Sequence, residues 1–478
     1  MDADVCAISL ATLSKALEQR DISSVEATRA CLTAIDEHDR AINSFISVEP
    51  DGALEQAAIA DKEIAAGRWR GPLHGVPLAH KDMFYRAGSI STCGSALCRD
   101  RVSSVTAGVL QRIGDAGAVY LGSLNMSEFA AGPTGHNVHF GHCHNPWNTA
   151  HITGGSSSGS GAAVAARLAF GALGSDTGGS IRLPAAMCGV VGLKPTYGLV
   201  SRYGVMPRCW SLDVVGPLAR TVEDCALLLQ AVAGHDARDR TTDMAPPPDY
   251  RAALAGSIRG MTIGVPTNSV FADVDADVQA HLDASLRELV ALGARVVPVE
   301  LPDPRAIYTL TNLVNKAEAA TIHAQWIRSR FDEYSLSAVN RIEAGFHVPA
   351  TLYLDALRLR APLLADFAAR VLDRVDAVHM PVLGIPVPTI DASEIRSTEG
   401  VPELMERITR YTRWVNYLGL PGLSVPCGFT ANGLPVAYQL LGRPFSEARL
   451  LRIAHAYQQA TDWHERQPDL LEAVHDSA

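Results

Sequence analysis

Two stretches rich in glycine and serine are the part of this sequence whose residue types could do chemistry. The first is Gly154-Gly155-Ser156-Ser157-Ser158-Gly159-Ser160-Gly161, and the second, from Gly174 to Pro184, contains Asp176-Thr177-Gly178-Gly179-Ser180-Ile181-Arg182. Small residues let the backbone approach a ligand closely and present N–H and O–H donors. The segment between the stretches is apolar and helix-like, which argues against a flexible linker.

Three known site patterns fit these stretches poorly. Gly155 to Gly159 matches the G-x-S-x-G elbow of α/β-hydrolases, with Ser157 as nucleophile, but a serine-rich run matches that pattern easily. Asp176-Thr177-Gly178 is similar to half of an aspartic protease site, and no second copy supplies the paired carboxylate. The glycines also lack the Gly-Lys-Ser/Thr ending of a phosphate-binding loop.

A combination of three motifs instead resembles the amidase signature family of serine hydrolases. The motifs are His80-Lys81-Asp82, the first glycine-serine run and the stretch from Asp176 to Arg182, in that order and at matching separations. The resemblance extends from about Arg70 to Gln467 and includes Pro421 to Pro426. The chain is similar both to stand-alone bacterial amidases and to the A subunit of a tRNA-dependent amidotransferase.

The resemblance implies a catalytic triad of Lys81, Ser156 and Ser180. Ser180 would be the nucleophile, Ser156 the bridging serine after a cis Gly155–Ser156 bond, and Lys81 the base. Lysine has a reference pKa of about 10.4, so holding it neutral near pH 7 costs roughly 4 to 5 kcal/mol, which burial can supply. Ser156 would relay the proton, because a hydroxyl both donates and accepts. No cofactor and no metal is expected.

The same resemblance also implies roles for the residues around the nucleophile. The backbone N–H groups of Thr177, Gly178, Gly179 and Ser180 would form an oxyanion hole at the start of a short helix. Asp176 and Arg182 are expected to brace this loop. Six residues are expected to contact the substrate: Met126, Phe129, His136, Asn137, Gly155 and Ile181.

Two other segments have unusual composition. Five histidines and Cys143 lie between His136 and His151, and such side chains are usual zinc ligands, but their spacing fits no standard site. We therefore expect a loop that lines the pocket there. The basic and aromatic stretch from Arg407 to Trp414 could recognise a carboxylate or cover a helix face, and the sequence leaves both possibilities open.

Short apolar runs alternate with amphipathic segments along the chain. Strands are predicted at 76–80, 118–121, 261–265, 296–299, 377–382, 423–426 and 436–441, and helices at 9–18, 24–38, 106–114 and 275–292. This alternation predicts an α/β fold with a mixed, mostly buried central sheet covered by helices on both faces and N-terminal helices packed outside. We expect one domain over 1–478, with a helical segment at 1–60, a signature core at about 70–220 and the rest of the same sheet at 250–470.

Composition and net charge limit the classes of molecule that this chain is expected to bind. The chain has 47% hydrophobic residues and a formal net charge of −10, without a single-sign run typical of nucleic-acid tails. No apolar run approaches the roughly 20 residues that span a bilayer. Nine cysteines without a Cys-x-x-Cys pair indicate reduced packing residues. We expect a cytoplasmic protein with a small-molecule amide substrate, no nucleic acid and no membrane partner; a homodimer is left open.

The predicted function is amide hydrolysis. The chain would cleave the C–N bond of a small amide, urea-like or carbamate substrate through a Ser180 acyl-enzyme. The alternative is the glutaminase A subunit of a tRNA-dependent amidotransferase. Two departures count against that alternative: the run Gly132-Pro133-Thr134-Gly135-His136-Asn137-Val138, and Thr409 where the amidotransferase has an acid.

Overall fold

A single eleven-stranded sheet runs through the computed structural model, which describes residues 5–267, 273–394 and 401–471. The strands lie in the order β1-β3-β2-β6-β8-β7-β12-β13-β11-β9-β10. Their bounds are β1 Phe45–Val48, β2 Pro77–Lys81, β3 Val119–Leu124, β6 Gly171–Asp176, β7 Val191–Lys194, β8 Val214–Ala219, β9 Thr262–Pro266, β10 Arg295–Val299, β11 Ala377–Pro381, β12 Gly422–Phe429 and β13 Pro435–Leu441. A separate hairpin joins β4 His144–Asn145 to β5 Asn148–Ile152.

The sheet is mixed, which confirms the predicted fold class. Strand β2 pairs in parallel with β3 and with β6, whereas β6, β8, β7, β12 and β13 follow one another in antiparallel pairs. All seven predicted strands are present, with bounds that differ by at most a few residues. Within the eleven-stranded sheet the sequence missed four strands, β1, β6, β7 and β8, and it also missed the hairpin strands β4 and β5. Strand β6 reads Gly-Ala-Leu-Gly-Ser-Asp, so it lacks the β-branched residues that indicate a strand.

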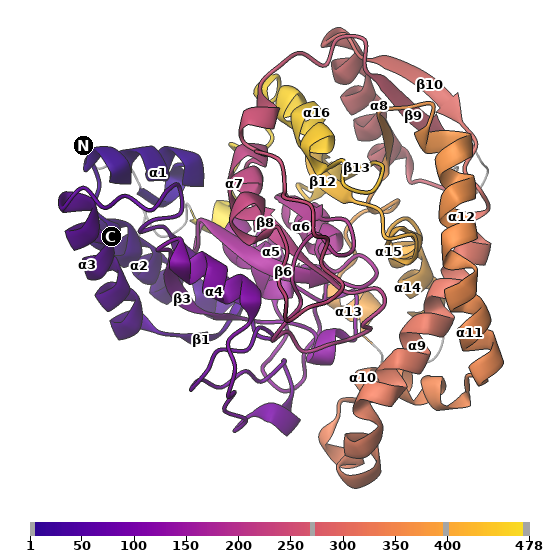
Figure 1. The fold of residues 1–478 in the computed structure, drawn as a ribbon, viewed down its shortest axis with the longest axis horizontal. Coiled ribbons are helices and arrows are strands. Elements are labelled where there is room, and N and C mark those ends of the chain that lie inside the picture. Colours follow the sequence, from indigo (N-terminus) through magenta and orange to yellow (C-terminus); the bar gives the residue numbers. More distant parts are fainter. Residues whose placement is uncertain (1–4, 268–272, 395–400, 472–478) are drawn as a thin grey trace.

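The N-terminal helices pack outside one end of the sheet, as predicted. Helices α1 Leu10–Gln19, α2 Ser24–Ile42 and α3 Pro50–Ala65 lie together at this end, with α2 and α3 in contact with β3 (Figure 1). Helix α2 begins with a capping box: the Glu26 N–H donates to Ser23 Oγ over 3.1 Å, and the Ser23 N–H donates to Glu26 Oε2 over 2.7 Å. These two bonds satisfy donors that the first turn of a helix leaves free.

A wall of helices stands at the opposite end of the molecule (Figure 1). It contains α9 Pro304–Ser329, α10 Leu336–Glu343, α11 Ala350–Arg358 and α12 Arg360–Phe367, with α14 Val401–Thr409 and α15 Arg413–Tyr417 between it and the sheet. The remaining helices are α4 Gly108–Asp115, α5 Ser158–Ala165, α6 Arg182–Cys188, α7 Val222–Val232, α8 Ala276–Ala291, α13 Ile390–Ser393 and α16 Glu447–Gln459. No helix among the described residues is long and apolar enough to cross a membrane.

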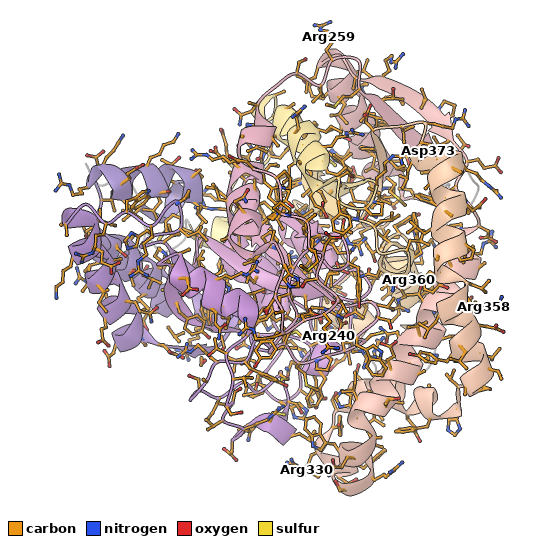
Figure 2. The ribbon with its side chains drawn as sticks, viewed as in Figure 1. Arg240, Arg259, Arg330, Arg358, Arg360 and Asp373 are labelled. Carbon is orange, nitrogen blue, oxygen red and sulfur yellow. The ribbon has the colours of Figure 1, made fainter. Side chains whose placement is uncertain are left out.

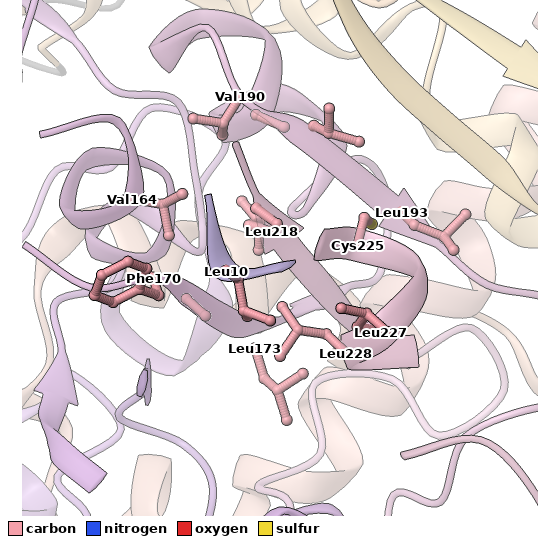
Figure 3. Close-up of a cluster of buried hydrophobic side chains, with 14 of the residues drawn as sticks. Leu10, Val164, Phe170, Leu173, Val190, Leu193, Leu218, Cys225, Leu227 and Leu228 are labelled. Carbon is pink, nitrogen blue, oxygen red and sulfur yellow. The ribbon is translucent and has the colours of Figure 1, made fainter. Parts of the chain in front are cut away.

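The core around the first half of the sheet is made of fully buried aliphatic side chains. Leu173 of β6, Leu193 of β7 and Leu218 of β8 meet Leu228 of α7 (Figure 3). Burial of such side chains contributes about 1.5 to 3 kcal/mol each. Charged side chains such as Arg259 and Arg358 instead point outward at the periphery (Figure 2). The strands that carry the candidate site are therefore held in a rigid interior.

The structure also shows the environments of the cysteines and of the apolar side chains of α8. All nine cysteines are buried and free of disulfides, as expected for packing residues. On α8, Val278, Leu282 and Leu289 are buried. Val290 is 50% exposed, because it follows Leu289 by one position and so points to the solvent side of the helix.

Candidate active site

Lys81 lies at the end of β2, in the interior of the protein. Its side chain is 1% exposed, and its Nζ lies 2.7 Å from Ser156 Oγ and 2.9 Å from Ser175 Oγ. Burial lowers the pKa of Lys81 to about 7, against the weaker opposing effect of Asp176 and Asp213. A large fraction of the amine is therefore neutral near pH 7.

The hydrogen bonds of Ser175 orient the amine of Lys81. The Ser175 hydroxyl donates its one proton to Met83 Sδ over 3.0 Å, so it accepts from a Lys81 N–H. With an N–H directed at Ser175, the neutral amine can direct its lone pair at Ser156. Ser175 was not among the residues expected from the sequence, because nothing in its strand distinguishes it before the pairing of β2 with β6 is known.

Ser156 is fully buried just before α5. The Gly155–Ser156 peptide bond is cis, and Ser156 is held by its carbonyl oxygen, which accepts the Ser127 N–H over 3.1 Å. Only glycine fits at position 155, since a Cβ there would lie 2.6 Å from the Gly135 backbone nitrogen. The next residue along, Ser157, donates its N–H to the Ser180 carbonyl oxygen over 3.3 Å, which ties the two serine-bearing segments together.

Ser180 lies after β6 and before α6, half-buried at the edge of a cavity. Asp176 shapes this loop: it accepts the Gly179 N–H over 2.7 Å and the Ile181 N–H over 3.1 Å. Among the described hydrogen bonds there is none from the N–H groups of Thr177, Gly178 or Ser180. Of the four N–H groups expected in an oxyanion hole, three are thus free to meet a substrate, and that of Gly179 is engaged by Asp176.

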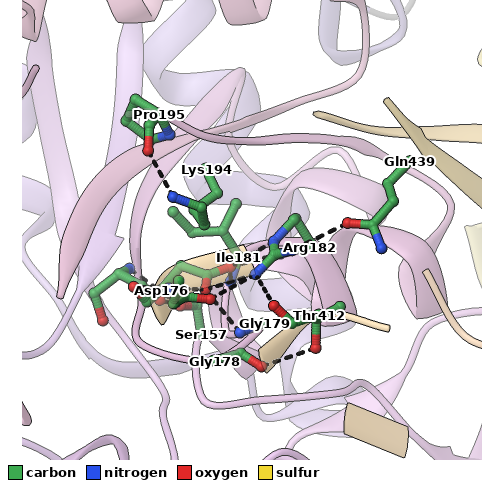
Figure 4. A network of polar contacts seen from close by, with 12 residues as sticks. Ser157, Asp176, Gly178, Gly179, Ile181, Arg182, Lys194, Pro195, Thr412 and Gln439 are labelled. Carbon is green, nitrogen blue, oxygen red and sulfur yellow. Dashed lines mark hydrogen bonds and ion pairs between the residues drawn. The ribbon is translucent and has the colours of Figure 1, made fainter. Parts of the chain in front are cut away.

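Asp176 is itself held by a buried ion pair. The Arg182 Nε lies 3.2 Å from Asp176 Oδ2, and both side chains are fully buried (Figure 4). Arg182 also donates to Gln439 Oε1, to the Thr412 carbonyl oxygen and to Asn416 Oδ1, at 2.8 to 3.0 Å. Burial acts to raise the pKa of Asp176, but the Arg182 guanidinium outweighs it and keeps the pKa of this carboxyl well below its usual range. This geometry agrees with the expected bracing role.

A cavity of about 500 Å³ opens in front of Ser180. One side is formed by residues 130–133 and by Thr177, Gly178 and Ser180, and the other by side chains of α9, α10, α14 and α15. The volume suits a small molecule. Thr409 and Arg413, from the stretch whose role the sequence left open, both line this cavity, as do Arg208 and Arg341, which the sequence did not single out. These arginines come from distant segments that meet only in the folded chain.

None of the six residues expected to contact substrate is among those that line this cavity. Met126 and Phe129 are buried in a separate apolar cluster, where the Phe129 ring lies 4.6 Å from the His323 ring. Gly155 and Ile181 are buried in the interior and act on the site through backbone contacts. Their expected substrate contacts stay predictions without support from the cavity lining.

The histidine-rich segment also lies away from the cavity lining. The His136 ring stacks on His142 at 4.6 Å, and burial lowers the pKa of His136 to about 4. Asn137 donates to the carbonyl oxygens of Gly94 and Met126, each over 2.8 Å, so it braces a loop. Within the described residues, no three histidine, cysteine or acidic side chains gather as metal ligands do.

Comparison with known proteins agrees with this geometry. The family model described as Amidase matches residues 26–451. The A subunit of the glutamyl-tRNA(Gln) amidotransferase from Methylococcus capsulatus is 43% identical, over 96% of this chain and 98% of that protein. Among solved structures, a chain from a vestigial protein complex tied to the origins of an s-triazine catabolic enzyme superposes with a TM-score of 0.88 at 32% identity, covering 95% of this chain and 98% of that one.

The native peptide amidase of Stenotrophomonas maltophilia superposes with a TM-score of 0.81 at 32% identity, covering 96% of this chain and 98% of that one. Relatives with different substrates thus share the whole length of the fold. The chain belongs to the amidase family, the amidase signature hydrolases that its motifs resemble, and is an enzyme of the C–N hydrolase type.

Proposed function

We propose that this chain hydrolyses the C–N bond of a small amide, urea-like or carbamate substrate through an acyl-enzyme on Ser180. The observation that carries the proposal is the buried contact of 2.7 Å between Lys81 Nζ and Ser156 Oγ, beside the loop that presents Ser180 to the cavity. A hydroxyl needs a base to become a nucleophile, and a neutral lysine is such a base.

The proposed reaction moves one proton along three side chains. Ser156 passes its proton to the lone pair of Lys81 and takes the proton of Ser180, whose Oγ attacks the substrate carbonyl carbon. The oxyanion of the tetrahedral intermediate accepts hydrogen bonds from the free N–H groups of Thr177, Gly178 and Ser180, each contributing about 3 to 4 kcal/mol. The relay then returns the proton to the leaving nitrogen, and ammonia or an amine departs.

Water completes the cycle. It loses a proton to the same Ser156–Lys81 pair and attacks the Ser180 ester, which releases the acid and restores the serine hydroxyl. The buried position of Lys81 keeps its amine partly neutral throughout, because solvent does not reach it. No step requires a group from outside the chain other than substrate and water.

A second candidate is the glutaminase A subunit of a tRNA-dependent amidotransferase, and the curated relatives favour it over a stand-alone amidase. They are A subunits of glutamyl-tRNA(Gln) amidotransferases by name, at 41 to 43% identity and nearly full length. That name contrasts with our expectation of no nucleic-acid partner. The cavity supports this candidate less, since no acidic side chain is among its described lining residues to meet the ammonium group of glutamine.

Ammonia release by the purified chain tests the proposal. The chain alone would be assayed with glutamine, aliphatic and aromatic amides, and ureido and carbamate compounds, with Ser180→Ala as the blank. We expect turnover of at least one class, reduced by at least about 10⁴-fold in Ser180→Ala. Turnover that survives the substitution would overturn the Ser180 mechanism, and activity on glutamine only with partner subunits and tRNA would establish the second candidate.

A further inference from the structure

The cavity in front of Ser180 is strongly basic. Four cationic side chains line it, Arg208, Lys316, Arg341 and Arg413, and no aspartate or glutamate is among its described lining residues. Lys316 is exposed at the surface of α9, where solvent screens its charge. The three arginines are less exposed: Arg208 is buried, and Arg341 and Arg413 are partly buried. Their charges therefore act at close range inside the cavity.

The guanidinium groups have neutral partners or none. Arg413 Nη1 donates to Asn312 Oδ1 over 2.6 Å and to the Tyr308 hydroxyl over 3.1 Å. Arg208 Nη2 donates to Asn315 Oδ1 over 3.2 Å, while its Nη1 is buried without a described partner. The Nε of Arg341 is likewise buried without a described partner. Buried donors of this kind are normally paired, so each points to a missing acceptor.

The three charges also repel one another. Burial, reinforced by the charges of Arg413 and Arg208, lowers the pKa of Arg341 to about 10. Burial likewise lowers the pKa of Arg208 to about 10, with Arg413 again acting against its charge. Such a cluster is costly in an empty site, because like charges at low dielectric destabilise each other. A bound anion would remove this cost.

The negative charge of Asp213 partly offsets the positive charge of Arg208 and raises the pKa of Arg208. The Asp213 oxygens, however, already accept hydrogen bonds from the Thr177 hydroxyl and from the backbone N–H groups of Arg208 and Cys209. If Asp213 is counted as a full negative charge, two of the three guanidinium charges remain without compensation. The charge balance of the cavity therefore corresponds to a ligand with two negative charges.

We propose that the substrate is a small amide or ureido compound that carries two anionic groups, such as carboxylates, and that Arg208 and Arg413 together with Arg341 select it. Guanidinium groups pair with carboxylates through two parallel hydrogen bonds, which gives both affinity and orientation. Arg413 packs beside Gly178: a Cβ atom at position 178 would lie 3.3 Å from the Arg413 Cγ. An anionic group held by Arg413 thus lies next to the loop that carries Ser180.

This inference rests on the proposed amide hydrolysis and sharpens its substrate class. It also separates the two candidate functions, because glutamine has no net charge and its ammonium group would face the arginines. A ligand with a second carboxylate in place of that ammonium group matches the cavity better.

A series of three amides tests the inference at constant chain length. Glutamine, 4-carbamoylbutanoate and 4-carbamoyl-2-carboxybutanoate differ only in bearing an ammonium, a hydrogen or a carboxylate on the same carbon. We expect kcat/KM to rise in this order, by about 10-fold or more at each step, because the first step removes a repelling ammonium group and the second adds hydrogen bonds between a carboxylate and the guanidinium groups. Equal rates, or a preference for glutamine, would overturn the inference.

Variants of the arginines test which side chains cause the expected preference for the dicarboxylate. Arg413→Met and Arg208→Met should each lower kcat/KM for the dicarboxylate by about 10- to 100-fold while changing that for glutamine much less. Arg407→Met is the matched control, since Arg407 lies on the neighbouring helix α14 and does not line the cavity. Because Arg208 is buried, its variant could fold poorly, and Arg413→Met keeps the test decisive. Arginine variants that match the control would contradict the proposal.

Binding without turnover separates the failure of this inference from the failure of the proposed function. Calorimetric titration of Ser180→Ala with 4-carbamoyl-2-carboxybutanoate needs no hydrolysis. Binding that weakens in Ser180→Ala/Arg413→Met supports the anion site even if the parent chain hydrolyses none of the three amides. Turnover of neutral amides by the parent, with no binding of the dicarboxylate, would leave the hydrolase and refute the anion site.

Discussion

The surroundings of Lys81 and of Lys194 differ in what the amine meets. Both lysines end a strand of the same sheet, both are buried, and burial lowers the pKa of each to about 7. Lys81 Nζ contacts the hydroxyls of Ser156 and Ser175. Lys194 Nζ donates to the Pro195 carbonyl oxygen over 2.8 Å (Figure 4), an acceptor that has no proton to give.

This difference shows that a lowered pKa alone does not make a base. A neutral amine acts on a nucleophile only when a proton-bearing group lies within hydrogen-bond reach and leads on to the substrate. Lys81 has that group in Ser156, whose segment is bonded to that of Ser180. Lys194 has no such route among its described contacts, so we expect its role to be structural.

The strongest test of the comparison replaces each lysine by methionine. Lys81→Met should lower kcat by about 10³-fold or more, because the relay loses its base. Lys194→Met should keep kcat within about 3-fold, since its amine contacts only a backbone carbonyl among the described groups. Steady-state kinetics on the best substrate, with circular dichroism to verify folding, would measure both. Equal losses in the two variants would break the comparison.

The hydrogen bond between Lys81 and Ser175 should account for a smaller part of the difference between Lys81 and Lys194. Ser175→Ala removes the acceptor that orients the Lys81 amine, and we expect kcat to fall by about 10-fold. The loss of a hydrogen bond to the protonated amine should also lower the pKa of Lys81, so the acid limb of the pH–rate profile should move to lower pH.

Ser160→Ala is the matched control for Ser175→Ala. Ser160 is also buried, but its hydroxyl donates to the Leu173 carbonyl oxygen over 3.2 Å and does not contact Lys81. The control should leave the acid limb in place. An acid limb that moves equally in both variants would mean that Ser175 acts only through packing.

A third prediction concerns the backbone that positions Ser156. In Gly155→Ala the new Cβ would lie 2.6 Å from Gly135 N and 2.8 Å from Gly132 O, so we expect a loss of about 1 to 3 kcal/mol in the free energy of unfolding. Gly114→Ala in α4 meets nothing within 4 Å and should be neutral or slightly stabilising. Denaturant melts would compare the two, and equal stability of both variants would contradict the tight fit.

The sequence identified the proposed catalytic side chains better than it identified the residues that line the cavity. Its motifs brought Lys81, Ser156 and the Ser180 loop together because each lies in a short segment whose residue types are constrained. It missed β6 and with it Ser175, since glycine-rich strands show no hydrophobic alternation. It also predicted substrate contacts at Met126, Phe129, His136 and Asn137, which lie between the first two motifs in sequence and are not among the residues that line the cavity.

The cavity wall could not be predicted in the same way. Arg208, Arg341 and Arg413 belong to segments far apart in the chain, and each alone is a typical surface arginine. Only the packing of α9, α10 and α15 against the signature loops brings their charges together. The proposed substrate choice thus rests on tertiary contacts that leave no local sequence pattern, whereas each member of the proposed triad lies in a recognisable motif.

The pH dependence of kcat/KM in the parent chain and in Lys194→Met tests most directly the claim that buried Lys81 is the neutral base. Because the reacting form is the neutral amine, the rate should fall tenfold per pH unit below about 7 and level off above it, in both proteins. A limb near the ordinary lysine value of 10.5, or a limb near 7 that disappears in Lys194→Met, would contradict the claim.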